Sequence, residues 1–330
     1  MALNLLTDIE GVAVGHATDL ALGSGVTTII FDQPAIASGA VLGGAPGGRE
    51  TALLDPSMTV QAVDAFVLSG GSAFGLDAAG GVQSGLREIG RGFEVGTVRV
   101  PIVPQAILMD LLNGGNKDWG LHSPYRNMGY EAFKAAGKGA FTLGTVGAGT
   151  GATTATFKGG LGSASAVTAS GHIVAALVAA NALGSATVGE GPNFWAAPFE
   201  ENEEFGGLGL PRSFDNRLRL KGRNITSTTI GVIVTDAALT KAQAHRLSIM
   251  AHDGLARAIL PAHLPFDGDT IFSAATGAKP LENPSDFMDI CHLATLVTAR
   301  AVARGIYEAM ALPMPNAQAA WRDKFASSAK

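Results

Sequence analysis

Four consecutive hydroxyl side chains precede an apolar strand and are the first candidates for chemistry: Thr226, Ser227, Thr228 and Thr229. A threonine hydroxyl within a chain is a weak nucleophile, because it needs a base beside it. A threonine at the start of a chain supplies its own base, since its α-amine has an ordinary pKa of about 7.7–8.0. A cut before such a residue would create a nucleophile together with its base. Hydroxyls are also common where strands begin, so the residue types alone favour a structural role.

The other motifs that could carry catalysis lack their usual context. The seven histidines include no HExxH pair, and none clusters with cysteine, so no metal is predicted. Gly147–Ala152 (GAGTGA) resembles a dinucleotide-binding loop, but residues 153–157 are β-branched and predict a strand where that loop needs a helix. Lys158 is not followed by Ser or Thr, as a phosphate-loop lysine would be. No GxSxG elbow is present. We therefore expect no nucleotide and no other cofactor.

The composition is that of a tightly packed globular protein. Of its 330 residues 47% are hydrophobic, 15% are charged and 44 are glycine, which excludes a disordered chain. The net charge of −5, without a basic cluster, excludes a nucleic-acid partner. Cys291 is the only cysteine, which fits a reducing compartment. The most apolar stretch, 172–188, is too broken to span a bilayer, and no secretion signal is found. We therefore expect a cytoplasmic protein that binds no membrane.

Short apolar and β-branched runs separated by glycine predict a series of strands. Several runs are apolar on both faces, as in a sheet that is covered on each side. The predicted strands are residues 25–31, 65–68, 140–145, 163–168, 172–179 and 228–234.

Three helices must complete these layers. One begins at Thr240, which forms a capping box with Gln243, and another begins at Ser285. The third covers residues 72–89 and contains four glycines, each unfavourable by about 1 kcal/mol relative to alanine. Their cost predicts that another element packs very close to this helix. The pattern predicts a single α/β domain over residues 1–330 with helix, sheet, sheet and helix layers.

Residues 199–227 differ in character from the segments on either side. They are polar and charged and contain Gly and Pro, and they end abruptly at the apolar strand that starts at Thr228. A long exposed loop that leads into a central strand is a suitable place for backbone cleavage, because the loop can be released without disturbing the core.

Residues 228–237 (TTIGVIVTDA) resemble the start of the small chain in the self-processing L-aminopeptidase/D-esterase (DmpA-like) family. This family also contains β-aminopeptidases and nylon oligomer hydrolases. Its nucleophile stands seven residues before the Thr of Thr-Asp-Ala, which is Thr228 here. The resemblance covers nearly the whole chain in the same order. Further matching segments are residues 6–16 (LTDIEGVAVGH), 68–76 (LSGGSAFGL), 147–162 (GAGTG to FKGGLG) and 267–270 (DGDT).

The resemblance implies a four-layer αββα sandwich of the N-terminal nucleophile hydrolase type. It also implies self-cleavage between Ser227 and Thr228, which would divide the chain into residues 1–227 and 228–330. The hydroxyl of Thr228 would attack the Ser227 carbonyl, and water would open the resulting ester. The freed Thr228 would then form an acyl-enzyme with an amide substrate.

The resemblance also assigns roles to further residues. Lys158 would lie beside the nucleophile and keep its amine neutral, and Asn181 would donate to the oxyanion. Asp267 and Asp269 lie two residues apart, which on a strand places both on one face. They would together hold the ammonium or hydroxyl group of Thr228. The implied substrate-binding residues are Gly70, Gly71, Ser72 and Gly149.

The expected substrate is a small peptide or an aliphatic amide, and the expected assembly is a homotetramer. Thr228 with Asp-Gly-Asp is closest to the nylon oligomer hydrolases, so 6-aminohexanoate oligomers are an alternative substrate. An acyltransferase of the ornithine acetyltransferase type is a second alternative, and an uncut glycine-rich binding protein is a third. Two residues depart from the family pattern. Ser227 stands where relatives commonly have Gly or Asn, and Met109 lies where the aminopeptidases have Tyr.

Overall fold

Nine strands form one mixed sheet in the part of the chain that the computed structural model describes, residues 2–222 and 227–325. Their order is β3-β7-β4-β2-β11-β10-β9-β8, and β1 pairs with β2. β5 and β6 form a separate hairpin. The strands are β1 (Val12–Asp19), β2 (Ser24–Val41), β3 (Gly48–Arg49), β4 (Ala62–Ser69), β5 (Phe93–Val95), β6 (Val98–Val100), β7 (Gln105–Ile107), β8 (Gly160–Val167), β9 (Ile173–Ala180), β10 (Ile230–Ala237) and β11 (Thr270–Lys279). The α-helices are α1 (Ala78–Glu88), α2 (Tyr125–Lys134), α3 (Lys241–Ala258), α4 (Pro284–Tyr307) and α5 (Trp321–Phe325), and the short 3₁₀ helices are Leu6–Asp8, Thr51–Leu54, Ser72–Asp77, Gly147–Gly149 and Ala197–Phe199.

The long strand β2 connects two halves of this sheet. Its first half pairs with β1 and β4, whereas its second half pairs with β11 and only at Ala35 and Ile36 with β4. An irregularity in its register with β4, between Ile30 and Ala35, separates the two halves. The sheet therefore consists of one layer built on β1, β4, β7 and β3 and another built on β11, β10, β9 and β8.

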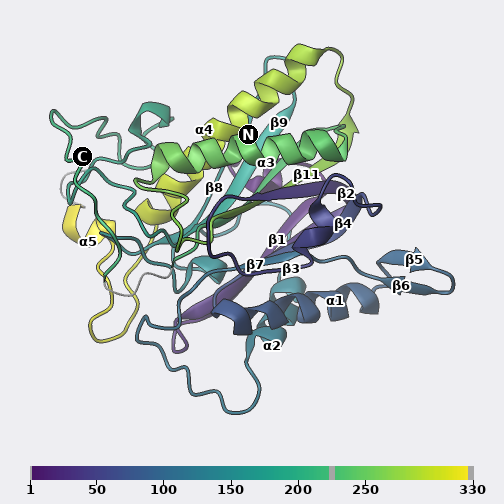
Figure 1. Ribbon diagram of the computed structural model, residues 1–330, viewed down its shortest axis with the longest axis horizontal. Coiled ribbons are helices and arrows are strands. Elements are labelled where there is room, and N and C mark those ends of the chain that lie inside the picture. Colours follow the sequence, from purple (N-terminus) through teal and green to yellow (C-terminus); the bar gives the residue numbers. More distant parts are fainter. Residues whose placement is uncertain (1, 223–226, 326–330) are drawn as a thin grey trace.

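Three apolar cores separate four layers of structure. Phe66 of β4 and Phe272 of β11 stack between the two sheet layers, with ring centroids 4.9 Å apart. Val67 of β4 faces α1 and α2 on one outer side, and Ile233 of β10 faces α3 and α4 on the other. Figure 1 shows α3 and α4 above the sheets and α1 and α2 below them. The predicted αββα sandwich is confirmed.

Glycines on α1 allow α2 to approach very closely, as the sequence predicted. A Cβ at Gly81 would collide with the carbonyl oxygen of Arg126, and a Cβ at Gly85 would collide with the ring of Phe133. The backbones could not pack at this distance with any larger residue, because protein interiors leave little free volume. The predicted single helix over residues 72–89 is divided in the structure into a 3₁₀ turn, Ser72–Asp77, followed by α1.

Most predicted strands are present, but two segments predicted as strands are not. Residues 140–145 form no strand, because Gly144 turns the chain with a φ of +85° where it lies against the end of α4. Residues 153–157 also form no strand, since the hydroxyl and amide of Thr154 both donate to the Phe157 carbonyl and close a turn. β-branched residues favour strands only where a neighbouring strand is available to pair with them.

The starts of the two long helices agree with the prediction. Thr240 caps α3 and forms the capping box with Gln243, and Asn283 caps α4 one residue before its first turn. None of the helices described is both long enough and apolar enough to cross a lipid bilayer. The loop after Phe199 contains no strand or α-helix in its described residues up to 222, but it is anchored by the buried Phe205.

Candidate active site

The ends of four adjacent strands bring the predicted catalytic residues together. Lys158 lies two residues before β8, Asn181 directly follows β9, and Thr228 lies two residues before β10. Asp267 and Asp269 lie just before the first residue of β11. In the observed register, the first residue of β8 pairs with the last of β9, and the first residues of β10 and β11 pair with each other. All five residues therefore lie at one end of the second sheet layer.

The peptide bond between Ser227 and Thr228 is buried in a set of polar contacts. The Oγ1 hydroxyl of Thr228 donates to the Ser227 carbonyl oxygen at 2.6 Å. The same oxygen accepts a bond from the Gly268 amide at 3.0 Å. The Thr228 amide donates to the Asn181 carbonyl at 3.0 Å, which fixes the backbone on the other side of the bond. The hydroxyl thus lies directly against the carbonyl group that it would attack.

Only glycine fits at position 268 in this arrangement. A Cβ there would come within 2.5 Å of Thr228 Oγ1 and within 2.8 Å of the Ala45 carbonyl oxygen. Real Cβ atoms do not approach backbone oxygens so closely, so a side chain at this position would displace the threonine hydroxyl. The middle residue of the Asp-Gly-Asp motif is therefore required by the close approach of Thr228.

Asp267 and Asp269 face each other, although they do not lie on a strand as predicted. Asp267 pairs with Ser227 in an isolated bridge, and β11 begins only at Thr270. A hydrogen bond between the two carboxyl groups can form only if one of them holds a proton. Burial and the neighbouring charge of Asp269 raise the pKa of Asp267. Asp267 is therefore the member of the pair that holds the proton.

Asp269 is kept charged by donors from two segments of the chain. Its Oδ1 accepts a bond from the Thr229 amide at 3.0 Å, and its Oδ2 accepts from Nδ1 of His263 at 2.8 Å and from the His263 amide at 2.9 Å. Burial alone would raise the pKa of Asp269, but these contacts with His263 outweigh it and hold the pKa below its ordinary value. Three donors to one carboxylate are enough to stabilise its charged form.

Lys158 is buried and largely deprived of water. Its Nζ donates to the carbonyl oxygens of Gly149 at 3.0 Å and Gly159 at 2.8 Å. Burial, together with the positive charge of Lys221, lowers the pKa of Lys158 to about 7. An amine with a pKa near neutrality can hold or release a proton at working pH, which is the property that acid–base catalysis requires.

Asn181 connects the Thr228 backbone to the wall of a cavity. Its side-chain oxygen accepts bonds from the Thr153 amide at 2.9 Å and from Nζ of Lys221 at 2.7 Å. Its Nδ2 donates to the Met109 carbonyl oxygen at 3.1 Å, which leaves the second N–H of the amide for another acceptor. Asn181 is fully buried, so this orientation is fixed by its partners.

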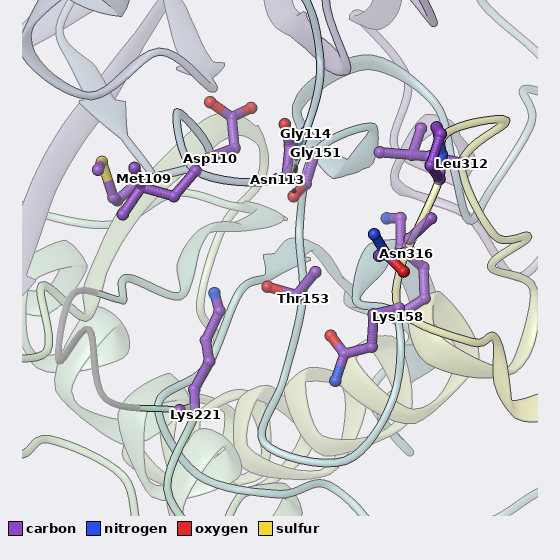
Figure 2. A pocket seen from close by; sticks show the side chains of 15 residues that line it. Met109, Asp110, Asn113, Gly114, Gly151, Thr153, Lys158, Lys221, Leu312 and Asn316 are labelled. Carbon is purple, nitrogen blue, oxygen red and sulfur yellow. Dashed lines mark hydrogen bonds between the residues drawn. The ribbon is translucent and has the colours of Figure 1, made fainter.

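A cavity of about 470 Å³ lies beside these residues (Figure 2). Lys221 points into it from below, Thr153 lies at its centre, and Asp110 lies at the opposite side. Polar and charged groups thus face an opening large enough for a few residues of peptide. Its lining comprises Met109, Asp110, Leu112, Asn113, Gly114, Gly151, Thr153, Lys158, Lys221, Gly222, Leu312, Pro315, Asn316, Ala317 and Gln318.

Asp110 is held in the cavity wall by neutral donors. Its Oδ1 accepts from the Gly71 amide at 2.8 Å, and its Oδ2 accepts from Oγ of Ser24 at 2.7 Å. The Ser24 hydroxyl in turn accepts from the hydroxyl of Tyr125 at 2.9 Å. Burial raises the pKa of Asp110, and the charge of Lys117 opposes that shift.

The four predicted substrate-binding residues lie around the cavity and do not themselves line it. Gly70 packs against the carboxylate of Asp110, whose other oxygen accepts the Gly71 amide. The Ser72 amide donates to the Leu108 carbonyl, and the Gly149 carbonyl accepts from Lys158. Their contacts in this structure are therefore with the residues that shape the cavity.

Sequence reasoning missed four groups of this site. His263, Lys221 and Asp110 lie in irregular segments, where no periodicity indicates which way a side chain points. The Gly268 amide is a backbone group, so no residue type reveals it. The one available signal was that charged residues and glycines are concentrated just before Thr228 and just before Thr270, where two strands begin.

Comparisons with known proteins agree on one family. The model of peptidase family S58 matches residues 4–319 of the chain. An uncharacterized aminopeptidase of Mycobacterium bovis is 42% identical over 296 residues, which cover 84% of this chain and 82% of that protein. An uncharacterized aminopeptidase of Mycobacterium leprae is 40% identical over 294 residues, covering 84% of this chain and 79% of that protein.

Solved structures show the same fold at lower identity. A β-aminopeptidase of Burkholderia sp. superposes with a TM-score of 0.71 at 23% identity, over 98% of this chain and 94% of its own. An L-aminopeptidase D-Ala-esterase/amidase of Ochrobactrum anthropi, described as a new variant of the Ntn hydrolase fold, gives a TM-score of 0.72 at 18% identity with the same coverage. The PH0078 protein of Pyrococcus horikoshii gives 0.73 at 24% identity, over 98% of this chain and 93% of its own.

Proposed function

The chain belongs to peptidase family S58, and we propose that it is an amide hydrolase that cuts itself between Ser227 and Thr228. Membership of this family, together with its aminopeptidase relatives, makes it a hydrolase of peptide bonds with the N-terminal nucleophile fold. Thr228 is the proposed nucleophile. The observation that carries the proposal is the contact of its hydroxyl with the Ser227 carbonyl, whose oxygen also accepts the Gly268 amide.

Self-cleavage begins with attack of Thr228 Oγ1 on the carbonyl carbon of Ser227. The Oγ1–C bond forms and the negative charge passes to the carbonyl oxygen, where the Gly268 amide already donates at 3.0 Å. The C–N bond then breaks, and the proton of the hydroxyl moves to the leaving nitrogen of Thr228. Water hydrolyses the resulting ester, which releases Ser227 as a carboxylate and Thr228 with a free amine. A preorganised donor at the developing oxyanion is usually the largest single contribution to such a step.

Hydrolysis of a substrate repeats the attack with a different carbonyl. The free amine of Thr228 takes the proton of its own hydroxyl, and Oγ1 forms an acyl-enzyme as the substrate amine leaves with that proton. Water then releases the acid and regenerates Thr228. Lys158 supports the neutral state of the amine, because its pKa of about 7 leaves it largely neutral at working pH, where it can accept a proton from the ammonium group of Thr228. Asn181 offers the spare N–H of its amide to the substrate oxyanion.

The two carboxyl groups have different tasks. Asp269 is held charged by His263 and by the Thr229 amide and supplies a fixed negative charge near the new amino terminus. Asp267 holds a proton and can donate a hydrogen bond, so the pair carries one negative charge and not two. Two carboxyl groups share one proton in this way when they lie too close together for both to be charged.

The proposed substrates are small peptides or aliphatic amides that fit the cavity of about 470 Å³. The pair Asp267 and Asp269 together with Thr228 favours 6-aminohexanoate oligomers as an alternative substrate class. Transfer of the acyl group to an amine, in the manner of the ornithine acetyltransferases, is the second alternative. We also propose the homotetramer that the resemblance implies and the cytoplasmic location that the composition predicts.

Two measurements test the proposal. Mass spectrometry of the purified protein should find two pieces, residues 1–227 and 228–330, and an unbroken chain in active protein would refute self-cleavage. A panel of amino-acid p-nitroanilides, β-peptides and aminohexanoate oligomers, assayed with and without an acceptor amine, identifies the substrate. Acyl transfer that exceeds hydrolysis at every substrate would favour the acyltransferase alternative.

A further inference from the structure

Lys221 belongs to the polar segment before the proposed cut, yet its side chain reaches the site. Its backbone amide donates to the Leu183 carbonyl at 3.0 Å, which ties this part of the segment to the turn after β9. Its Nζ donates to Oδ1 of Asn181 at 2.7 Å. Figure 2 shows the side chain extending from the edge of the cavity towards its centre.

The contact with Lys221 contributes to the orientation of the Asn181 side chain. Two donors, Nζ of Lys221 and the Thr153 amide, occupy the side-chain oxygen of Asn181. A carboxamide that accepts on one side must present its NH₂ group on the other, because the two ends are fixed in one plane. Loss of Lys221 would leave the Thr153 amide as the one donor to the oxygen and the Met109 carbonyl as the acceptor for the NH₂ group, so the amide would be held less firmly towards the oxyanion.

The charge of Lys221 also acts on Lys158. Burial lowers the pKa of Lys158 most, the charge of Lys221 lowers it further, and Asp110 opposes both effects. Burial lowers the pKa of Lys221 itself to about 8, and the nearby charge of Asp110 opposes that shift. A positive charge at Lys221 therefore favours the neutral form of Lys158 at working pH.

We propose that Lys221 is a positioning residue for hydrolysis, which holds the Asn181 amide towards the oxyanion. The inference rests on the proposed function. Lys221 lies on the larger piece after the cut, and its backbone bond to Leu183 keeps it in the cavity wall. The segment that leads to the cleavage site thus continues to contribute to the site after cleavage.

Steady-state kinetics of three variants over a range of pH test this role. Lys221→Met should lower kcat about tenfold or more with a smaller change in KM, because it misplaces the oxyanion donor and leaves the groups that bind the substrate in place. The acidic limb of its pH profile should move to higher pH, because Lys158 then keeps its proton up to a higher pH. Lys221→Arg retains the charge and the donor and should restore both kcat and the limb. A rise in KM with unchanged kcat in Lys221→Met would overturn the proposal.

Lys241→Met is the matched control, because Lys241 is another buried lysine that donates to the carbonyl oxygens of Leu53 and Val60 and not to Asn181. Its kcat and acidic limb should match those of the wild type, and an equal shift would overturn the proposal. If Lys221→Met is not cut and so has no measurable kcat, the rates of self-cleavage of the variants are compared in place of kcat. In that case a Lys221→Arg chain that folds but is inactive would overturn the proposal. A wild-type chain that is never cut refutes the proposed function, whereas a cut, active wild type with an unaffected Lys221→Met refutes this inference alone.

Discussion

Nδ1 of His263 lies 2.8 Å from Oδ2 of Asp269, and the backbone amide of His263 donates to the same oxygen at 2.9 Å. His263 adopts a φ of +59°, which is uncommon for a residue other than Gly, and its ring and backbone amide both donate to one carboxylate. Burial alone would lower the pKa of His263, but its bond with Asp269 and the charge of that carboxylate raise it. The pair therefore sets the charge next to the proposed amino terminus of Thr228.

Replacement of His263 by Asn should destabilise the fold in a pH-dependent manner. The raised pKa of folded His263 contributes to the free energy of unfolding. This contribution is complete below the ordinary pKa of 6.5 and is lost as the pH rises through the folded value. The lowered pKa of folded Asp269 contributes to the free energy of unfolding above the ordinary pKa of 3.8, and this contribution is lost as the pH falls through the folded value. The loss should be about 1–2 kcal/mol near pH 5.5 and smaller near pH 8.5.

Urea unfolding of an uncut Thr228→Ala chain, with and without His263→Asn, measures this difference at fixed protein concentration. The uncut background keeps unfolding within one chain. An equal loss of stability at both pH values would show that the two residues do not form a charged pair.

Removal of the Thr228 hydroxyl should abolish both cleavage and activity. Thr228→Ala should appear on a denaturing gel as one full-length band, and mass spectrometry should find no pieces of residues 1–227 and 228–330. Thr228→Ser retains a hydroxyl on Cβ and should be cut and active.

Thr229→Ala provides the control for this variant. Its hydroxyl is buried without a hydrogen-bond partner among the described residues, and only its backbone amide bonds to Asp269. It should be cut like the wild type. Normal cleavage of Thr228→Ala would mean that another residue is the nucleophile.

A side chain at position 268 should slow self-cleavage. The Cβ of Gly268→Ala would lie 2.5 Å from Thr228 Oγ1 and must displace it from the Ser227 carbonyl. Displacement of a reacting atom from its productive position typically costs about 10- to 100-fold in rate. Uncut chain should therefore accumulate in pulse-labelled protein.

Gly137→Ala is the matched control, because a Cβ there would meet no atom within 4 Å. Its cleavage rate should equal that of the wild type. A wild-type rate in Gly268→Ala would show that the contact between Gly268 and Thr228 does not limit the reaction.

The layered fold was predictable because periodic apolar runs and capping residues report on local structure. The capping box at Thr240 indicated the start of α3, and the glycines of residues 72–89 indicated the close approach of α2. Residues 140–145 and 153–157 misled the prediction, since their β-branched residues have no strand partner and bend into turns instead.

The resemblance to the family, and not the residue pattern alone, indicated Thr228, Asn181 and Lys158 as residues of the proposed site. In the structure these three residues lie at strand ends, and strand pairing brings them together. His263 and Lys221 reach the site from irregular backbone, and their directions depend on a φ of +59° at one and on a single bond to the Leu183 carbonyl at the other. Local sequence carries no signal for contacts of that kind.

Lys158 should control the acidic side of the activity profile. Its pKa is lowered to about 7 by burial and by Lys221, so the amine is mostly neutral above that pH and charged below it. Because a neutral Lys158 is the form that can accept a proton from Thr228, activity should rise with pH through about 7. Lys158→Met should fold, lose roughly 100-fold or more in kcat and lack this rise.

Lys241→Met is the control that distinguishes a catalytic effect of Lys158→Met from the general effect of removing a buried amine. Lys241 is also buried and donates to the carbonyl oxygens of Leu53 at 2.8 Å and Val60 at 2.7 Å, but it lies at the start of α3 and does not line the cavity. Its removal should lower stability while kcat and the rise near pH 7 remain as in the wild type. Steady-state kinetics of both variants between pH 5.5 and 9 distinguish the two cases, and an unchanged kcat in Lys158→Met would remove Lys158 from the catalytic site.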